Sequence, residues 1–533
     1  YAMAECVMDD GLSELLEGIH SIRTCYAYEG GFYDRLHKDS YGYGSVDSIR
    51  DDGSFVRTEY HTDSYYSRCL PKKTFTYGRR SPDGGVELLG MSVTDLRNAP
   101  YAQPVREESV QYGTSGGTAS VRTEYEYGDY GNVTHMTRTQ LKNGTSDDDM
   151  TLTAEIEWDD SKSRYLHSLP TSIEVYGGDG TLLRKRTGSY DDYGALASLA
   201  QYHKEGDAAE YSYTYDSYGN MTSVTDGLGI STEYTYDKQL HQYPLSTVRS
   251  GGGISYTSSA EWNTVTGTKT SETDINGNKM SYTYDGWQRL ATVRSPYDTG
   301  TVPAVSYSYG IDGEGRWYAV TDNKVSFNPS DRQVIKTVIQ SDGLGRALRT
   351  AKTGEVYDRN SDSKKTGWNV SGAVEYDAMG RVASQGQPYF IEGGFTALAL
   401  DSGSFTAPTI RPTLTEYDSL DRVIRTELPD GSVQTVEYDV TSSGEPYTKT
   451  TDPLGNKSLQ RTDPAGNIIF VERLDSGETS LTSATYTYNA IGEMLKATDV
   501  KGNDIKATYD MLGRKLTLSS VDGGRREYTY DAY

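Results

Sequence analysis

The sequence predicts an all-β protein built from tandem β-hairpins, and three observations lead to that prediction. Turn signatures recur about every 10 residues, tyrosine reaches 46 of 533 residues, and helical periodicity is nearly absent. About six residues remain between successive turns, which is a usual strand length. Because tyrosine has an apolar ring and a polar hydroxyl, it suits strands with one buried and one solvated face.

The repeat is clearest in residues 485–533. Tyr488, Tyr509 and Tyr530 stand 21 residues apart, and each is followed by Asn or Asp. A second turn, at 498–503, lies between the first two, so one repeat contains two turns and two strands. The unit of the fold is therefore predicted to be a β-hairpin.

The turns follow the pattern D-x-x-G-[N/R], in which each fixed position has a physical role. Asp accepts a hydrogen bond from a backbone N–H two residues on, and Gly supplies a positive φ. The pattern occurs at 216–220, 274–278, 342–346, 377–381, 452–456, 463–467, 499–503 and 510–514, with variants at 226–230, 285–289 and 418–422. We expect positive φ at Gly219, Gly277, Gly455, Gly502 and Gly513. Turns preceded by Tyr alternate with turns preceded by Thr, so we expect the two kinds on opposite edges of one sheet.

The residues that we single out belong to these repeat turns, and their predicted role is structural. They are Tyr215, Asp216, Gly219, Asn220, Tyr284, Asp285, Tyr417, Asp418, Tyr438, Asp439, Tyr488, Tyr509, Asp510, Gly513, Tyr530 and Asp531. No residue is predicted to be catalytic or to bind a cofactor or metal.

Four parts follow from the repeat frame. Residues 1–120 form a pre-repeat β region joining to an upstream module, and 121–310 form a first repeat array. An irregular insertion at 311–413 precedes a second array at 414–533, which stops in mid-repeat. One helix-like run, 6–19, has leucines at helical spacing. The chain begins with Tyr1 and not Met, as expected for a piece of a longer polypeptide.

Composition argues against several functions. A net charge of −24 disfavours binding to nucleic acid or anionic lipid, and no apolar run approaches the ~20 residues that span a bilayer. Cys6, Cys25 and Cys69 lack C-x-x-C spacing. Three free thiols are expected over one disulfide with a leftover thiol, and a metal site is not expected.

Other candidate sites have simpler explanations. Asp274 to Asp285 is similar to a calcium loop, but Lys279 stands where an EF-hand needs Gly. Residues 147–149, three aspartates, are expected to form a solvated loop. The glycine-rich turn 342–346 lacks the following helix of a phosphate loop. The seven histidines show no metal-ligand or nucleophile spacing, and carboxylate pairs are so frequent that a chance pair carries little weight.

These repeats resemble the Rhs/YD-repeat family. YEGGFYDRLHKDSYGYGSV (28–46), TEYHTDSYYSRCLPKKTFTY (58–77) and WNVSGAVEYDAMGRVASQGQPYF (368–390) are similar to the region that joins a virulence-plasmid-type propeller to YD repeats in the B component of bacterial toxin complexes. The resemblance implies a β-ribbon that spirals into a hollow shell around a toxin polypeptide. We find no D-P-x-G-x-x-D segment of the kind at which family members cleave themselves. Asp452-Pro453 and Asp463-Pro464 lie in ordinary turns, so the resemblance supports shell architecture and not self-cleavage.

Three functions are open at this point. The first is a non-enzymatic shell segment of a secreted or surface bacterial protein that encapsulates a toxin or effector. Its partners would be the rest of the same polypeptide or a C-component-like shell partner, and an enclosed toxin. The second is a teneurin-like adhesion or carbohydrate-binding protein. The third, a glycan-active enzyme, has the least support.

Overall fold

The computed structural model is a single layer of antiparallel β-strands. It describes residues 2–12, 19–36, 38–79, 85–97, 102–159, 165–298, 300–313, 315–326, 333–358, 362–393 and 410–531. In these ranges the one helical element is a short 3₁₀ turn, η1 (Asp148–Met150). The predicted all-β class, a large curved antiparallel sheet of hairpins, is confirmed.

Two large sheets contain almost all strands. The first, of 28 strands, consists of β1 (Glu5–Asp9), β2 (Ser21–Glu29), β5 (Ser45–Arg50), β6 (Phe55–Tyr60), β7 (Pro71–Tyr77), β8 (Leu88–Leu96), β9 (Pro104–Tyr112), β10 (Thr118–Tyr127), β11 (Val133–Lys142), β12 (Thr145–Ser146), β13 (Leu152–Trp158), β14 (Pro170–Gly177), β15 (Leu182–Tyr190), β16 (Leu196–Lys204), β17 (Asp207–Tyr215), β18 (Met221–Asp226), β19 (Ser231–Tyr236), β20 (Pro244–Gly251), β21 (Ile254–Asn263), β22 (Thr268–Thr273), β23 (Lys279–Tyr284), β24 (Leu290–Arg294), β25 (Val305–Ile311), β26 (Trp317–Lys324), β27 (Val334–Ser341), β28 (Ala347–Asp358), β29 (Ser363–Val370) and β32 (Tyr389–Glu392).

The second sheet has 13 strands. They are β30 (Val374–Tyr376), β31 (Val382–Gln385), β33 (Thr413–Tyr417), β34 (Val423–Glu427), β35 (Val433–Val440), β36 (Pro446–Thr451), β37 (Lys457–Thr462), β38 (Ile468–Leu474), β39 (Ser480–Tyr488), β40 (Met494–Asp499), β41 (Asp504–Tyr509), β42 (Lys515–Ser520) and β43 (Gly524–Glu527). A small pair, β3 (Tyr33–Asp34) and β4 (Asp39–Ser40), lies between β2 and β5.

Neighbouring strands in the sheets are mostly neighbours in the chain. For example, β17 pairs with β18 and β18 with β19, all antiparallel. The turn after Tyr215 therefore lies at one end of β18, and the turn after Thr225 lies at the other. The prediction that the two kinds of turn occupy opposite edges is confirmed. We call these the tyrosine edge and the opposite edge.

The predicted helix at 6–19 is wrong at its start. Cys6 to Asp9 belong to β1, which pairs with β2 in the register Glu5 to Cys25. Pairing with a neighbouring strand outweighs the helical spacing of the leucines, because it satisfies the backbone of both segments. Leu15 and Leu16 lie outside the described residues. The helical turn η1 also lies outside the one range where we expected a helix.

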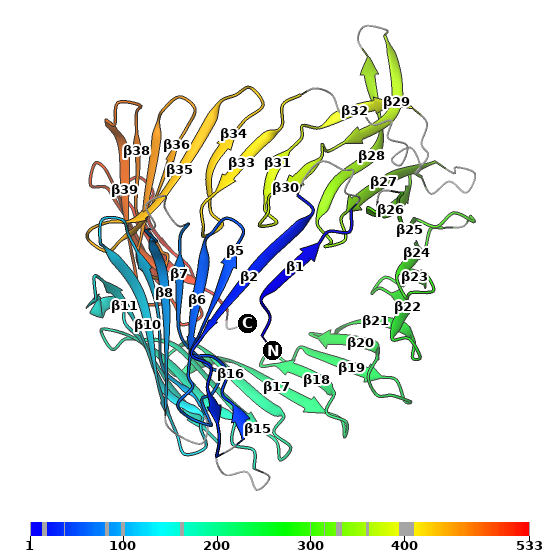
Figure 1. Ribbon diagram of the computed structural model, residues 1–533. Helices are drawn as coiled ribbons and strands as arrows, with labels where there is room; N and C mark the ends of the chain where they lie inside the picture. The colour runs from blue at the N-terminus through cyan, green and yellow to red at the C-terminus, as the bar shows by residue number, and fades with distance from the viewer. Residues whose placement is uncertain are drawn as a thin grey trace.

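The ribbon curves round on itself as an open ring and then overlaps its own beginning. In Figure 1 the chain runs from the blue strands through cyan and green, and the yellow and orange strands of the second sheet lie beside the blue and cyan ones. We call the part up to residue 311 the first winding and the part from 312 onward the second winding. The wall is one sheet thick for most of its length.

A compact hydrophobic core lies in β26–β29. Val320, Val338, Ala351, Trp368 and Val370 form it. This cluster lies in the segment predicted as an irregular insertion, and the change from the first to the second sheet falls there too. The four-part division of the chain stays a prediction. No described residue belongs to a helix long and apolar enough to cross a membrane.

Candidate functional site

The repeat turns are closed by their aspartates. The Asp216 carboxylate accepts hydrogen bonds from the backbone N–H groups of Tyr218 and Asn220, both at 2.9 Å, and from the Asn220 side chain at 3.0 Å. Gly219 has φ +86°. The hydrogen bonds from Asn220 lower the pKa of Asp216, because they favour its charged form. The carboxylate thus organises the turn while it is ionised.

In other turns an arginine replaces the asparagine. The Arg514 Nε donates to Asp510 at 2.7 Å, and the same arrangement recurs at Asp285 with Arg289 and at Asp418 with Arg422. Burial acts to raise the pKa of Asp510, but the hydrogen bonds from Arg514 and the backbone outweigh it, and the pKa is lowered.

The predicted positive φ is found at all five glycines. The values are +86° at Gly219, +82° at Gly277, +86° at Gly455, +80° at Gly502 and +81° at Gly513. Gln288 and Asp421, which replace Gly in two variant turns, have φ of +63° and +62°. The geometry of the turn is therefore kept even where the residue type is unfavourable.

The tyrosine that precedes each turn has a contact that the sequence did not predict. Its hydroxyl donates to the backbone carbonyl at the start of a preceding strand on the tyrosine edge. The bonds run from Tyr215 to Leu196, Tyr284 to Lys269, Tyr417 to Val382, Tyr488 to Ile468, Tyr509 to Met494 and Tyr530 to Lys515, at 2.8 to 3.1 Å. Each tyrosine therefore ties one repeat to the repeat before it.

Arginines of the turns cover the next tyrosine along this edge. The guanidinium of Arg381 lies 4.7 Å from the centre of the Tyr417 ring, and that of Arg514 lies 4.7 Å from the Tyr530 ring. Such cation–π contacts stabilise partly exposed rings. The signal was present in the sequence, since each D-x-x-G-R turn is followed by a tyrosine of the next repeat.

One predicted turn is wrong by two residues. Asp439 is still within β35, and the turn is closed by the N–H of Gly444 donating to the carbonyl of Thr441 at 2.8 Å. The Asp439 carboxylate instead accepts a hydrogen bond of 2.8 Å from the backbone of Thr114, in the first winding. Tyr438 lies in β35 beneath the Arg422 guanidinium, at 4.3 Å. The Asp531 carbonyl accepts a bond from Arg514 at 2.7 Å.

A seam joins the two windings. The tyrosine edge of the second winding contacts the opposite edge of the first. Four ion pairs between described residues cross it: Arg50 with Asp421 at 2.7 Å, Lys142 with Glu445 at 3.4 Å, Arg184 with Glu493 at 2.6 Å, and Arg346 with Asp10 at 3.5 Å. In the first three pairs the cation belongs to the first winding, and in the fourth it belongs to the second winding.

Backbone contacts accompany the ion pairs. The N–H of Met511 donates to the carbonyl of His203 at 3.0 Å, and the Asn143 side chain donates to the Ser442 carbonyl at 2.8 Å. At Gly117 an added Cβ would stand 1.9 Å from the Thr441 carbonyl oxygen. Glycine is needed there because the two backbones touch.

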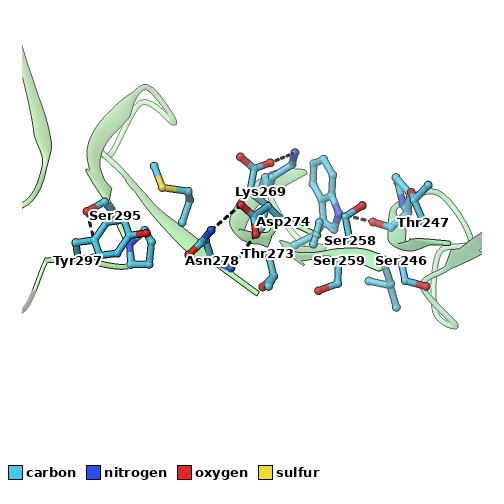
Figure 2. Close-up of a pocket in the computed structure, with 17 residues that line it drawn as sticks. Ser246, Thr247, Ser258, Ser259, Lys269, Thr273, Asp274, Asn278, Ser295 and Tyr297 are labelled. Atoms are coloured by element: carbon cyan, nitrogen blue, oxygen red, sulfur yellow. Dashed lines mark hydrogen bonds and ion pairs between the residues drawn. The ribbon is translucent and has the colours of Figure 1, made fainter. Parts of the chain in front are cut away.

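A groove with a volume of about 590 Å³ lies across β20–β23. Trp262 donates from its ring N–H to the Pro244 carbonyl at 2.9 Å, and Lys269 pairs with Glu272 at 2.9 Å. Figure 2 shows the labelled side chains in a row along the groove and not gathered at one point. The described lining residues include no histidine or cysteine and form no nucleophile–base pair.

The carboxylates of the calcium-loop candidate are already engaged. Asp274 accepts from the backbone N–H groups of Asn276 and Asn278 and from the Asn278 side chain, and Asp285 accepts from Arg289. Among the described residues no cluster of His, Cys, Asp and Glu could hold a metal ion. Cys6, Cys25 and Cys69 are free thiols.

Fold and contacts together define a wound, single-layer shell of YD-type hairpins. Comparison with known proteins agrees with this class. Residues 2–74 match the family described as "Insecticide toxin TcdB middle/N-terminal region". No curated protein sequence matches the chain.

Three similar solved structures cover 96% of this chain. They are TcdB2-TccC3 (TM-score 0.73, 14% identity, 36% of that chain), TcdB2-TccC3 without the hypervariable C-terminal region (0.73, 14%, 38%) and the Photorhabdus luminescens Tc holotoxin pore (0.72, 13%, 38%). The chain thus spans less than two fifths of the length of these structures. The predicted resemblance to the B component of bacterial toxin complexes is confirmed, in the matched segment and in the fold.

Proposed function

We propose that this chain is part of the wall of a hollow container that encloses a toxin or effector polypeptide. The chain would act as a wall and not as a catalyst. Its partners would be further polypeptide of its own kind or a C-component-like shell protein, together with the enclosed guest. We further propose that a bacterium secretes this protein or displays it on its surface.

The main support for the proposal is the diameter of the ring that the strands would form. The first sheet alone has 28 strands, and neighbouring strands stand about 4.8 Å apart, which gives an arc of roughly 130 Å. Closed as a ring, that arc would have a diameter of roughly 40 Å. Side chains reach only about 5 Å from a sheet, since packed sheets lie about 10 Å apart. They cannot fill such a space, so room remains for a guest.

The side chains on the faces of such a wall suit contact with an unfolded guest polypeptide. Strands present half-buried tyrosine rings on one face, and hydroxyl pairs such as Thr283 with Thr292 and Thr508 with Thr517 on the other.

Protease protection tests the container. The protein is purified from its native source with any copurifying toxin polypeptide and exposed to a non-specific protease. We expect the guest to survive with the wild-type wall and to be digested when Arg50→Glu and Arg184→Glu open the seam. Equal digestion with both walls would sink the proposal, as would a density map showing a filled β-sandwich. Specific glycan binding with no protected guest would favour the adhesion function.

A further inference from the structure

Lys324 and Asp298 form a buried pair of opposite charge that belongs neither to a repeat turn nor to the seam. Their side chains are 2% and 0% exposed, and the Lys324 Nζ lies 3.7 Å from the Asp298 Oδ1. Neither atom has a hydrogen-bond partner among the described residues. Buried charges are usually hydrogen-bonded to their partners, because the loss of hydration is otherwise uncompensated. The pair therefore calls for an explanation beyond a simple ion pair.

Ala304 contacts both residues and brings them together. Asp298 lies in the loop between β24 and β25, and Lys324 is the last residue of β26. The N–H of Ala304 donates to the Asp298 Oδ2 at 2.7 Å, and the carbonyl of Ala304 accepts from the N–H of Lys324 at 2.9 Å. The Arg294 side chain fixes the same loop by donating to two of its carbonyls, at 3.1 and 2.8 Å. Backbone contacts of three neighbouring strands thus determine where the two side chains meet (Figure 1).

The two carboxylate oxygens of Asp298 have different surroundings. Oδ2 accepts hydrogen bonds from the backbone N–H groups of Ser295 at 2.8 Å and Ala304 at 2.7 Å. Oδ1 lies on the side of Lys324 and accepts no hydrogen bond from the described residues. Backbone donors at about 2.7–3.1 Å are the arrangement that stabilises the negative oxygen of a tetrahedral intermediate in acyl transfer. Asp298 is thus arranged as an acyl group and Lys324 as the amine that attacks it.

We propose that Lys324 and Asp298 form an intramolecular amide cross-link. The Lys324 ammonium first gives a proton to Oδ1, which leaves a neutral amine and a carboxylic acid. The amine nitrogen then attacks Cγ, and an electron pair of the C=O bond moves to Oδ2. When the C=O bond forms again, the Cγ–Oδ1 bond breaks, and Oδ1 leaves as water with its own proton and one from the nitrogen. One ammonium and one carboxylate thus become one amide and one water.

Burial favours the amide over the ion pair. Proton transfer removes two charges that have lost their hydration, and the flexible stem of lysine lets Nζ approach Cγ. Because both groups are held in one place, the reaction needs no bimolecular encounter. In the amide, Oδ2 keeps its two N–H donors, and only one neutral N–H is added. Exclusion of water protects the new bond from hydrolysis.

The cross-link would close residues 298–324 into a covalent loop. This loop contains β25 and the whole of β26, where the first winding passes into the second. A covalent loop restricts the unfolded chain, so the cross-linked protein should resist unfolding better than an uncross-linked variant. The inference concerns the wall itself and does not rest on the wall holding a guest.

Mass spectrometry of the intact, denatured full chain tests the bond. The wild type should be lighter than its sequence by one water. Trypsin should leave the peptides that contain residues 298 and 324 joined, because it does not cut after an acylated lysine. Lys324→Arg keeps the positive charge but supplies no amine for the amide, so this variant should have its full sequence mass. Asp298→Ala removes the acyl group and should have its full mass too.

Lys336→Arg is the matched control. Lys336 pairs with Asp322 across β26 and β27, but these side chains are 18% and 28% exposed. Water can reach this pair, so it should form no amide, and the control should still be lighter by one water. Unchanged circular dichroism shows that each variant folds, and Lys324→Arg should melt at a lower temperature than Lys336→Arg.

The wild-type result decides the proposal whether or not the variants fold. A wild-type chain with its full sequence mass would overturn the cross-link. Loss of water that persists in Lys324→Arg would also overturn it, because that loss would come from another reaction, such as ring closure at an Asp–Gly sequence. A joined peptide that contains residues 322 and 336 in place of 298 and 324 would contradict the role of burial.

Discussion

The hydroxyl of Tyr509 donates a hydrogen bond of 3.0 Å to the backbone carbonyl of Met494, which begins the neighbouring strand β40. The bond crosses from one repeat to the next, and equivalent bonds recur along the tyrosine edge. A tyrosine is needed at this position because phenylalanine would fill the space but leave the carbonyl without its donor.

Tyr509→Phe should therefore destabilise the second array locally, by about 1 kcal/mol, the usual net worth of a hydrogen bond. Hydrogen–deuterium exchange should become faster in β40–β42 and stay unchanged in the first winding. Tyr530→Phe is the matched control. Its ring is 45% exposed, so water can replace the lost donor and the effect should be smaller. Equal effects at both positions would contradict this account.

Gly513→Val should cost more stability than Gly219→Val. Both glycines have φ above +80°, so a side chain at either costs ~1–2 kcal/mol in the turn. A Cβ at 219 meets no atom within 4 Å, whereas a Cβ at 513 stands 3.0 Å from Arg184 and 3.1 Å from Glu493. The greater loss of stability expected at 513 reflects the crowding of the added side chain by residues of the seam. Thermal unfolding of the two variants measures the difference. Identical melting temperatures would show that the seam accommodates the added side chain without loss of stability.

Acid should weaken the hairpins. The pKa values of Asp216, Asp274 and Asp499 are lowered by hydrogen bonds from the asparagine that ends each turn. A lowered pKa in the folded state contributes stability above the unfolded value of about 3.9 and loses it as pH falls through the folded value. The melting temperature should be nearly level from pH 7 to about 5 and fall below about 4.

Asp499→Asn provides the control for this pH dependence. Its side chain no longer titrates, so its hairpin should contribute less to the acid-induced loss than the wild-type hairpin. Exchange rates of amides in β40 and β41 at pH 7 and pH 3 report this directly. Greater stability at pH 3 than at pH 7 would refute the role of the turn carboxylates.

Reversal of charge should open and then restore the seam. Arg184 and Glu493 are 32% and 14% exposed, so their pair is partly screened and worth ~1 kcal/mol. Arg184→Glu should speed proteolysis near the turn 489–493, and adding Glu493→Arg should slow it again. Failure of the double variant to recover would mean that the pair itself does not hold the windings together.

Local features of the fold were predictable from sequence. The turn pattern located nearly every hairpin and the alternation of the two edges, because both depend on residues within one repeat. The role of the tyrosines was missed, since the partner of each hydroxyl is a backbone carbonyl and leaves no mark in the pattern of side chains.

Contacts between windings were beyond the reach of the sequence. Asp439 looks like the start of a turn because it follows Tyr438, yet its carboxylate serves Thr114, 325 residues away. The spacing of repeats does not indicate which turn of the second winding contacts which turn of the first winding. The prediction of a helix at Cys6 to Asp9 was wrong for the same reason. Pairing with β2 determines the conformation of this segment, and the spacing of the leucines does not.

The near-exclusive pairing of each strand with its predecessor has a consequence for how the chain folds. Contact order stays low within each hairpin, so strands can add one at a time, as in a zipper growing from the end synthesised first. Only the seam requires residues more than 300 apart, such as Arg184 and Glu493. We therefore expect closure of the ring to be one late step in folding. A nascent chain released before about residue 312 would have folded hairpins but no seam between the two windings.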